Sequence, residues 1–247
     1  LCIGLSGCGK NADTVAGSSI PIEPGEHVMY GSYQGEPVEW RVLDKKDREI
    51  LLLSEYGLDA QPFDTSGKSR VDWKDSTIRK WLNDDFYNSA FSEKEKENIV
   101  ESKSEGFEEY NTSMNLTGGG KPYAYLEREI EDKVFLLSNT ELCAYFSEDP
   151  YPGCYSDPYA HKELLCYPTA YAKQQLETRY QTETCGWWLC NHVYEDDSVE
   201  LVSAYGQGSG TSRENIKANT KSIAVRPAMW VTWQSDMEMV EANQQVE

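Results

Sequence analysis

The sequence predicts an α+β fold in which an antiparallel sheet carries flanking helices and long irregular loops. Three patterns support this class: alternating apolar and polar residues early in the chain, helical spacing over residues 75–86, and an aromatic, strand-rich stretch at 185–233. Four of the seven tryptophans lie in this last stretch. We therefore expect it to form a three-strand meander at the centre of the core.

The first strands are indicated by residues 28–31 and 38–43, which flank the turn sequence Gln34-Gly35 and together predict a β-hairpin. In the second of these segments apolar and charged residues alternate, which predicts one buried face. Residues 50–54 form a continuous apolar run, as expected for a strand that is covered on both faces.

Helix starts are predicted at three kinds of signal. Asp75-Ser76 precedes an apolar stripe at helical spacing, and Ser-x-x-Glu capping boxes stand at 92–95 and 138–141. Pro168 suits the first turn of another helix. Residues 133–137 are a further apolar segment that predicts a strand.

The bulk composition excludes some classes of partner. The formal net charge of the 247-residue chain is −19, which argues against binding to nucleic acid, because phosphate backbones require positive surfaces. No stretch reaches the ~20 consecutive apolar residues that a membrane-spanning helix needs.

The N-terminal sequence Leu5-Ser6-Gly7-Cys8 resembles the lipobox of bacterial lipoproteins. This resemblance implies cleavage before Cys8 and lipid attachment to its thiol, so that the protein would be anchored outside the bacterial cell membrane. We accordingly expect a signal-peptide remnant at 1–7, a flexible tether at 8–26, one α+β domain at 27–234, and a disordered acidic tail at 235–247.

Seven sequence blocks, taken in their order along the chain, resemble a family of uncharacterised bacterial extracellular domains that often occur on lipoproteins. The resemblance covers residues 28–233 and implies a fold similar to that of C-type lectins and formylglycine-generating enzymes. It implies no activity. The blocks are Val38-Glu39-Trp40-Arg41-Val42-Leu43, Leu52-Leu53-Ser54-Glu55-Tyr56-Gly57-Leu58, Arg79-Lys80-Trp81-Leu82-Asn83-Asp84-Asp85-Phe86-Tyr87, Val134-Phe135-Leu136-Leu137-Ser138, Pro168-Thr169-Ala170-Tyr171-Ala172, Trp187-Trp188-Leu189 and Val225-Arg226-Pro227-Ala228-Met229-Trp230.

The chain departs from this family after Trp187-Trp188-Leu189. The usual members continue with Arg-Ser-Pro-Gly, whereas this chain has Cys190-Asn191-His192-Val193. If the missing arginine shapes a site in the family, that site differs here.

We expect some of the cysteines to form disulfide bonds, because neighbouring thiols tend to oxidise outside the cytosol. Cys185 and Cys190 stand near opposite ends of one expected strand, beyond the Cα separation of ~7 Å that a disulfide tolerates. We favour a disulfide between Cys154 and Cys166, inside an irregular segment. The C-x4-C spacing of the other pair is also similar to the redox cysteines of formylglycine-generating enzymes.

The candidate ligand contacts all lie in the closing stretch: Trp187, Asn191, His192, Tyr205 and Arg226. Neighbouring residues of a strand point to opposite faces, so one of two adjacent tryptophans is expected in the core. The other is expected to stack on a sugar or to pack beneath a loop. A buried Arg226 requires a carboxylate partner, so its role is also expected to be structural. His192 with Cys190 is either a partial zinc or copper ligand set or an ordinary pair.

Calcium is the one cofactor for which the sequence offers ligands. Glu195, Asp196, Asp197 and Asn191 supply several oxygen atoms close together, and Asp196 and Asp197 are the central pair. An exposed acidic turn is the alternative interpretation. No other cofactor is predicted.

Three functional hypotheses follow. The first is a cell-surface lipoprotein domain that binds a glycan or a protein, since the chain has no Gly-x-Ser-x-Gly motif and no other convincing catalytic set. The alternative is an oxidative or metal-dependent enzyme of the formylglycine-generating type that uses Cys185 or Cys190. The third is a structural envelope protein without a small ligand.

Overall fold

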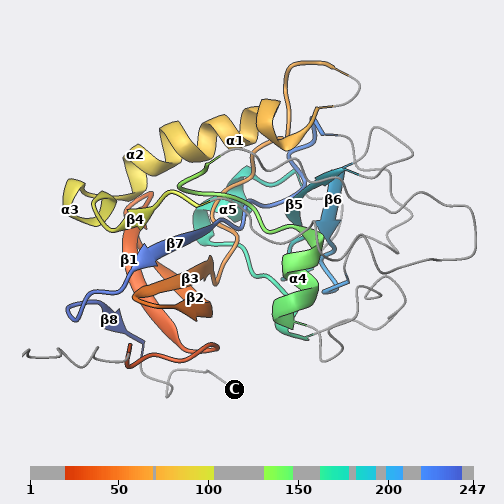
Figure 1. Cartoon of the computed structure of the whole chain (residues 1–247). Coiled ribbons are helices and arrows are strands. Elements are labelled where there is room, and N and C mark those ends of the chain that lie inside the picture. The colour runs from red at the N-terminus through yellow and green to blue at the C-terminus, as the bar shows by residue number, and fades with distance from the viewer. Residues whose placement is uncertain are drawn as a thin grey trace, which may run out of the picture.

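A computed structural model of the chain describes residues 20–68, 71–102, 131–146, 162–177, 182–192, 199–207 and 218–240. Over these residues the fold combines a six-stranded sheet, a two-stranded sheet and short helices, which confirms the mixed α and β class (Figure 1). The strands are β1 (His27–Tyr33), β2 (Glu36–Lys46), β3 (Glu49–Ser54), β4 (Ile99–Val100), β5 (Trp187–His192), β6 (Val199–Val202), β7 (Ala228–Thr232) and β8 (Glu238–Met239). The helices are α1 (Thr77–Trp81), α2 (Tyr87–Ala90), α3 (Glu93–Lys96), α4 (Asn139–Phe146) and α5 (Ala170–Gln175).

The predicted hairpin joins β1 to β2. Gln34 and Gly35 both have positive φ, at 53° and 85°, and Tyr33 pairs with Glu36 across the turn. Two successive positive φ angles give a turn whose twist matches that of the flanking strands, and glycine adopts the second angle without strain. The sequence signal and the observed turn therefore agree.

The six strands of the larger sheet lie in the order β4-β7-β3-β2-β1-β8, and every neighbouring pair is antiparallel. The apolar run of β3 is buried on both faces, as predicted. One edge of β3 pairs with β2 and the other with β7, where Leu52 lies opposite Met229. The expected three-strand meander is therefore wrong: β7 pairs with β3 over five residue pairs, and within the described ranges only Ala224, ahead of β7, bridges to Trp187 of β5.

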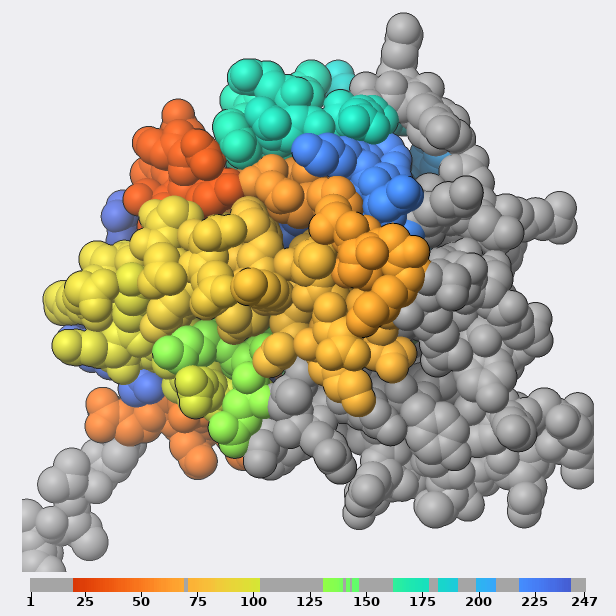
Figure 2. Space-filling model, turned by 90° about the horizontal axis from the view of Figure 1, so that it is seen from above, coloured from red at the N-terminus to blue at the C-terminus, as the bar shows by residue number. Residues whose placement is uncertain are grey.

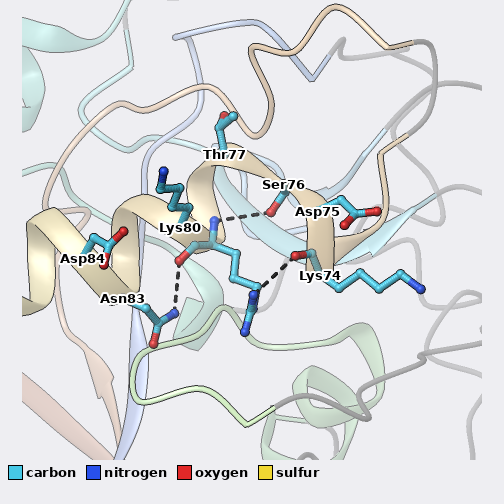
Figure 3. A pocket seen from close by; sticks show the side chains of 8 residues that line it. Lys74, Asp75, Ser76, Thr77, Lys80, Asn83 and Asp84 are labelled. Carbon is cyan, nitrogen blue, oxygen red and sulfur yellow. Dashed lines mark hydrogen bonds between the residues drawn. The ribbon is translucent and has the colours of Figure 1, made fainter.

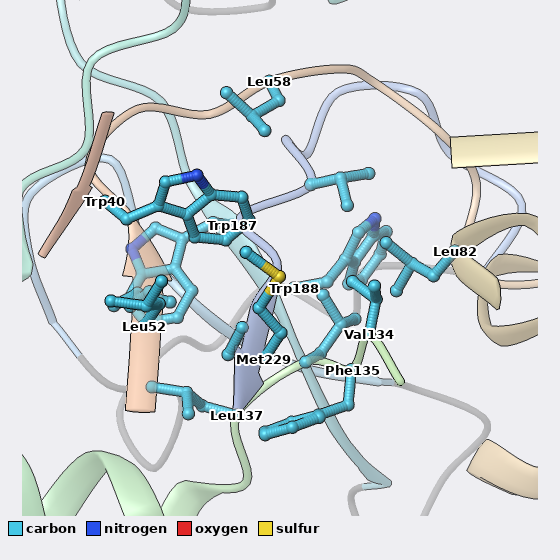
Figure 4. Packing of buried hydrophobic residues seen from close by; sticks show 14 of the residues in the cluster. Trp40, Leu52, Leu58, Leu82, Val134, Phe135, Leu137, Trp187, Trp188 and Met229 are labelled. Carbon is cyan, nitrogen blue, oxygen red and sulfur yellow. The ribbon is translucent and has the colours of Figure 1, made fainter. Parts of the chain in front are cut away.

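Strands β5 and β6 form the two-stranded sheet, and they pack on the same hydrophobic core as the larger sheet. Trp187 and Trp188 are both fully buried and project from opposite sides of β5 (Figure 4). Trp187 lies toward Trp40, whereas Trp188 lies toward Leu82 (Figure 4). One continuous core therefore includes the tryptophans of both sheets.

Helices α1 and α2 form one helical run, because a π-helical turn at Leu82–Phe86 connects them. Ser76 caps the start of α1 through its side chain, as the sequence predicts. The capping boxes at Ser92 and Ser138 are also present. At the start of α5 the capping residue is Thr169, so Pro168 precedes the cap and does not occupy the first helical turn.

Three further predictions need correction at the edges of the fold. The tether ends earlier than residue 26, because Ile20 and Ile22 are buried in the core. The tail is not disordered from residue 235, because β8 pairs with β1. Residues 133–137 form no strand in the structure; Phe135 makes a single bridge to Ala228, although the segment is buried.

Among the described residues, the helices are too short to cross a bilayer, and none is sufficiently apolar over the required length.

Candidate functional site

Arg226 is the buried centre of the first candidate site. Its side chain is 0% exposed, and its Nε donates to the carbonyl oxygen of Ser54 at 2.8 Å. The guanidinium carbon lies 5.0 Å from the centre of the Trp187 ring, close enough for a cation–π interaction. Its two terminal nitrogens have no hydrogen-bond acceptor among the described residues. Such a buried cation is costly unless a nearby anion compensates it.

Glu55, directly after β3, is the carboxylate partner that a buried Arg226 requires. A terminal nitrogen of Arg226 is 3.7 Å from the Glu55 carboxylate. Glu55 also accepts from Arg41 at 3.2 Å and lies 3.8 Å from His27, which in turn contacts Glu39 at 2.6 Å. Glu55 therefore links the buried arginine to a half-buried charge cluster on the outer side of the sheet.

Two thiols lie next to this arginine. The backbone amide of Cys185 donates to the carbonyl oxygen of Cys166 at 2.8 Å, and the Cys185 thiol points at the same oxygen at 3.4 Å. The Cys166 thiol in turn lies 3.8 Å from the carbonyl oxygen of Tyr167. Both are free thiols and buried. The sequence contains no signal for this contact, because the two residues belong to segments that meet only in the folded chain.

The pKa values of the two thiols are shifted in opposite directions, although Arg226 lowers both. Burial raises the pKa of Cys166, but the hydrogen bond from Cys185 and the positive charge of Arg226 lower it, and the net pKa is below the ordinary value. The pKa of Cys185 is raised, because it donates to Cys166 and is buried. Cys166 is thus the thiol that more readily becomes a thiolate.

Gly57, which is also buried, covers the two sulfurs on one side. A Cβ atom on Gly57 would lie 3.2 Å from the Cys185 sulfur and 3.5 Å from that of Cys166. Gly57 also donates to the carbonyl oxygen of Tyr167 at 3.0 Å, which holds residues 162–177 against the end of β3. Seen from above, that segment lies beside the chain that follows β3 (Figure 2). Tyr56 and Tyr167 are exposed at this surface, at 39% and 48%.

A second candidate site is a pocket around the start of α1, with a volume of about 470 Å³ (Figure 3). Every residue that lines it is polar or charged, and none is a histidine or cysteine. The lining residues are Lys74, Asp75, Ser76, Thr77, Arg79, Lys80, Asn83 and Asp84.

The wall of this pocket is fixed by the buried carboxylate of Asp132. Asp132 accepts from Arg79 at 2.7 Å, from Trp73 at 2.8 Å and from Asn83 at 3.4 Å. Asn83 also accepts from the backbone amide of Lys133 at 2.9 Å. Arg79 and Asn83 are therefore held in place before any ligand arrives.

The predicted ligand residues do not form one open surface. Trp187 and Arg226 are buried, and so is Trp188, so the stacking alternative for one of the two tryptophans is wrong. Trp187 packs in the core, and its indole donates to the carbonyl oxygen of Leu164 at 3.1 Å. Tyr205 is 57% exposed in the turn after β6. Asn191 and His192 belong to β5, but their side chains lie outside what the structure describes.

Several predictions fall on residues outside the described ranges: lipidation of Cys8, the acidic group with Asp196 and Asp197, and the Cys154 end of the predicted disulfide. Cys166, its other end, is a free thiol in contact with Cys185. Over the described part of the chain, no group of three or more His, Cys, Asp or Glu side chains is arranged to hold a metal ion.

Comparison with known proteins gives one match. Residues 47–233 match the family model described as "Domain of unknown function (DUF6273)". Neither the curated proteins nor the solved structures provide a match.

Proposed function

We propose that this chain, which belongs to the DUF6273 family, is a ligand-binding domain that recognises a glycan at the pocket around α1. The lipobox-like sequence at Cys8 supports the further proposal that it acts outside the bacterial cell membrane as a lipoprotein. Its mixed fold with an antiparallel sheet is compatible with the C-type-lectin-like architecture that the sequence blocks imply. We propose that the domain has this C-type-lectin-like fold.

The observation that carries the proposal is the chemistry of the pocket. Its volume of about 470 Å³ falls within the ~300–1,000 Å³ of small-molecule sites. Its lining supplies hydroxyl, amide, carboxylate and cationic groups beside aliphatic side-chain carbons, so it suits a ligand that carries many hydroxyl groups on a carbon ring. A sugar can donate to Asp84 and accept from Lys80, and both of these side chains are exposed.

Rigidity supports binding at this place. Arg79 and Asn83 keep their positions through Asp132, and Ser76 is held by its role as the cap of α1. Preformed polar groups lose little conformational freedom when a ligand binds.

The test is a calorimetric titration of the full chain with each member of a panel of neutral, acidic and amino-sugar oligosaccharides, which measures the affinity. Lys80→Ala and Asp84→Ala are each expected to lower the affinity for the binding sugar by tenfold or more. Asp85→Ala is the matched control, because Asp85 is an exposed neighbour of the same charge that does not line the pocket. Its affinity should stay within twofold of the wild type. A panel without any binder, or equal losses for Asp84→Ala and Asp85→Ala, would refute the proposal.

The second candidate function is an oxidative enzyme that uses Cys185. The contact of Cys185 with Cys166 beside Arg226 favours it, although the partner thiol is not Cys190 as the sequence suggested. The amide of Cys190 instead donates to the carbonyl oxygen of Leu137. Copper uptake by the wild type that is lost in Cys185→Ser would support this enzyme over the binding domain.

A further inference from the structure

We propose that Cys166 and Cys185 form a reversible disulfide bond, a redox site that is separate from the ligand pocket and does not depend on the proposed function. The two residues come from different segments of the chain, yet their backbones are hydrogen-bonded at 2.8 Å, and the Cys185 thiol donates to the Cys166 carbonyl oxygen at 3.4 Å. Both sulfurs also lie next to Gly57, within 3.5 Å of the position that a Cβ atom would take there. Both thiols are free in the structure, which therefore represents the reduced state of the pair.

The backbone geometry suits a disulfide. Because backbone bond lengths are fixed, the hydrogen bond from the Cys185 amide to the Cys166 carbonyl oxygen at 2.8 Å keeps the two Cα atoms within about 6.7 Å of each other. That separation lies within the ~4.4–6.8 Å found for disulfides. Closing the bond therefore requires mainly rotation of the two side chains.

The oxidant is a small disulfide such as oxidised glutathione. The Cys166 thiolate attacks one of its sulfur atoms, a mixed disulfide forms, and one glutathione thiolate leaves. The Cys185 thiolate then attacks the Cys166 sulfur, and the second glutathione leaves. Two electrons pass from the protein to glutathione, and the two thiol protons end on the two glutathione molecules. Because Gly57 covers both sulfurs, its segment must move aside during the exchange.

Arg226 makes the disulfide easy to reduce. The positive charge of Arg226 stabilises the Cys166 thiolate, and two of its nitrogens have no hydrogen-bond acceptor among the described residues. Oxidation removes the sulfur that can carry this negative charge and leaves the Glu55 carboxylate, 3.7 Å from a terminal nitrogen of Arg226, as an anion next to the guanidinium. A group that stabilises the thiolate favours the reduced pair, as in strongly oxidising thiol pairs.

Glu55 has the opposite effect. Its negative charge raises the pKa of Cys166, so it disfavours the thiolate and favours the disulfide. Its side chain is 22% exposed and glutamine has nearly the same shape, so Glu55→Gln removes the charge beside Arg226 without removing packing. Glu39 has the same 22% exposure and lies in the same charge cluster, but it contacts His27 at 2.6 Å, whereas Glu55 is the carboxylate beside Arg226.

The experiment equilibrates the full chain with graded ratios of reduced to oxidised glutathione at pH 7. Acid quenching, alkylation and peptide mapping then give the fraction of each linkage. We expect a peptide that joins Cys166 to Cys185, in an amount that changes reversibly with the glutathione ratio. No such peptide at any ratio, a link from Cys154 to Cys166 in its place, or a disulfide that persists at every ratio would overturn the proposal.

Variants test the role of the charges. Glu55→Gln is expected to shift the midpoint ratio at least threefold toward the reduced pair, whereas Glu39→Gln leaves it unchanged. Arg226→Met is expected to shift it at least tenfold toward the disulfide. If Arg226→Met does not fold, Glu55→Gln carries the test, and equal midpoints for Glu55→Gln and Glu39→Gln would contradict the electrostatic argument. Failure of sugar binding at α1 would leave this result untouched.

Discussion

Replacement of Glu200 by glutamine should stabilise the protein at neutral pH and have little effect in acid. Glu200 lies on β6 with 9% of its surface exposed, and it accepts a hydrogen bond from Asn139 at 3.0 Å. Burial raises the pKa of Glu200 from 4.5 to about 7, and the bond from Asn139 offsets only part of that effect. The folded protein therefore disfavours the charged carboxylate.

The magnitude follows from the difference between the two pKa values. The rise from 4.5 to about 7 corresponds to about 3 kcal/mol, at about 1.36 kcal/mol per pH unit. The folded-state pKa of Glu200 is above its unfolded value. The free energy of unfolding is therefore highest below pH 4.5 and falls by about this amount as the pH rises to about 7. Glutamine does not ionise, so the Glu200→Gln variant avoids the loss.

Urea denaturation at pH 4.5 and pH 8 measures the effect. We expect the free energy of unfolding of Glu200→Gln, relative to the wild type, to be about 3 kcal/mol higher at pH 8 than at pH 4.5. Glu36→Gln, at an exposed site on β2, controls for the removal of one negative charge from a chain with a net charge of −19. A difference between the two pH values no larger than that of Glu36→Gln would refute the argument that burial sets this pKa.

Two further substitutions test the packing that positions the candidate sites. Gly57→Ala should lower the free energy of unfolding by about 1–3 kcal/mol, because its Cβ would lie 2.8 Å from that of Ala224. Adding Ala224→Gly should recover part of the loss in urea denaturation, and no recovery would argue against a clash. Asn83→Ala should cost about 2–3 kcal/mol by thermal unfolding, since Asn83 accepts from two backbone amides. Asn88→Ala, an exposed helical asparagine, should change stability by less than about 0.5 kcal/mol, and an equal effect at both sites would contradict this role.

The local elements of this fold were predictable because their signals act within a few residues. The cap at Ser76 and the capping box at Ser92 depend on bonds between positions three apart, and the Gln34-Gly35 turn depends on two φ angles. The apolar run of β3 predicted its burial on both faces. Such signals do not specify which elements become neighbours.

The candidate sites were less predictable for that reason. Arg226 was expected to need a carboxylate, but nothing near it in the sequence selects Glu55, which is 3.7 Å away only because β7 pairs with β3. The contact of Cys185 with Cys166 likewise depends on tertiary structure, because Gly57 holds residues 162–177, which include Cys166, against the end of β3. The pocket around α1 requires Asp132, which comes from a distant segment.

The sequence by itself determined the fold class, the hairpin and the helix caps, because these depend on side-chain alternation and on bonds between near neighbours. The tertiary structure alone decided that β7 pairs with β3, that Trp187 is buried, and that two thiols lie beside Arg226. Those contacts depend on which strand edges and buried faces remain uncovered after the local elements form, and that is a property of the whole chain.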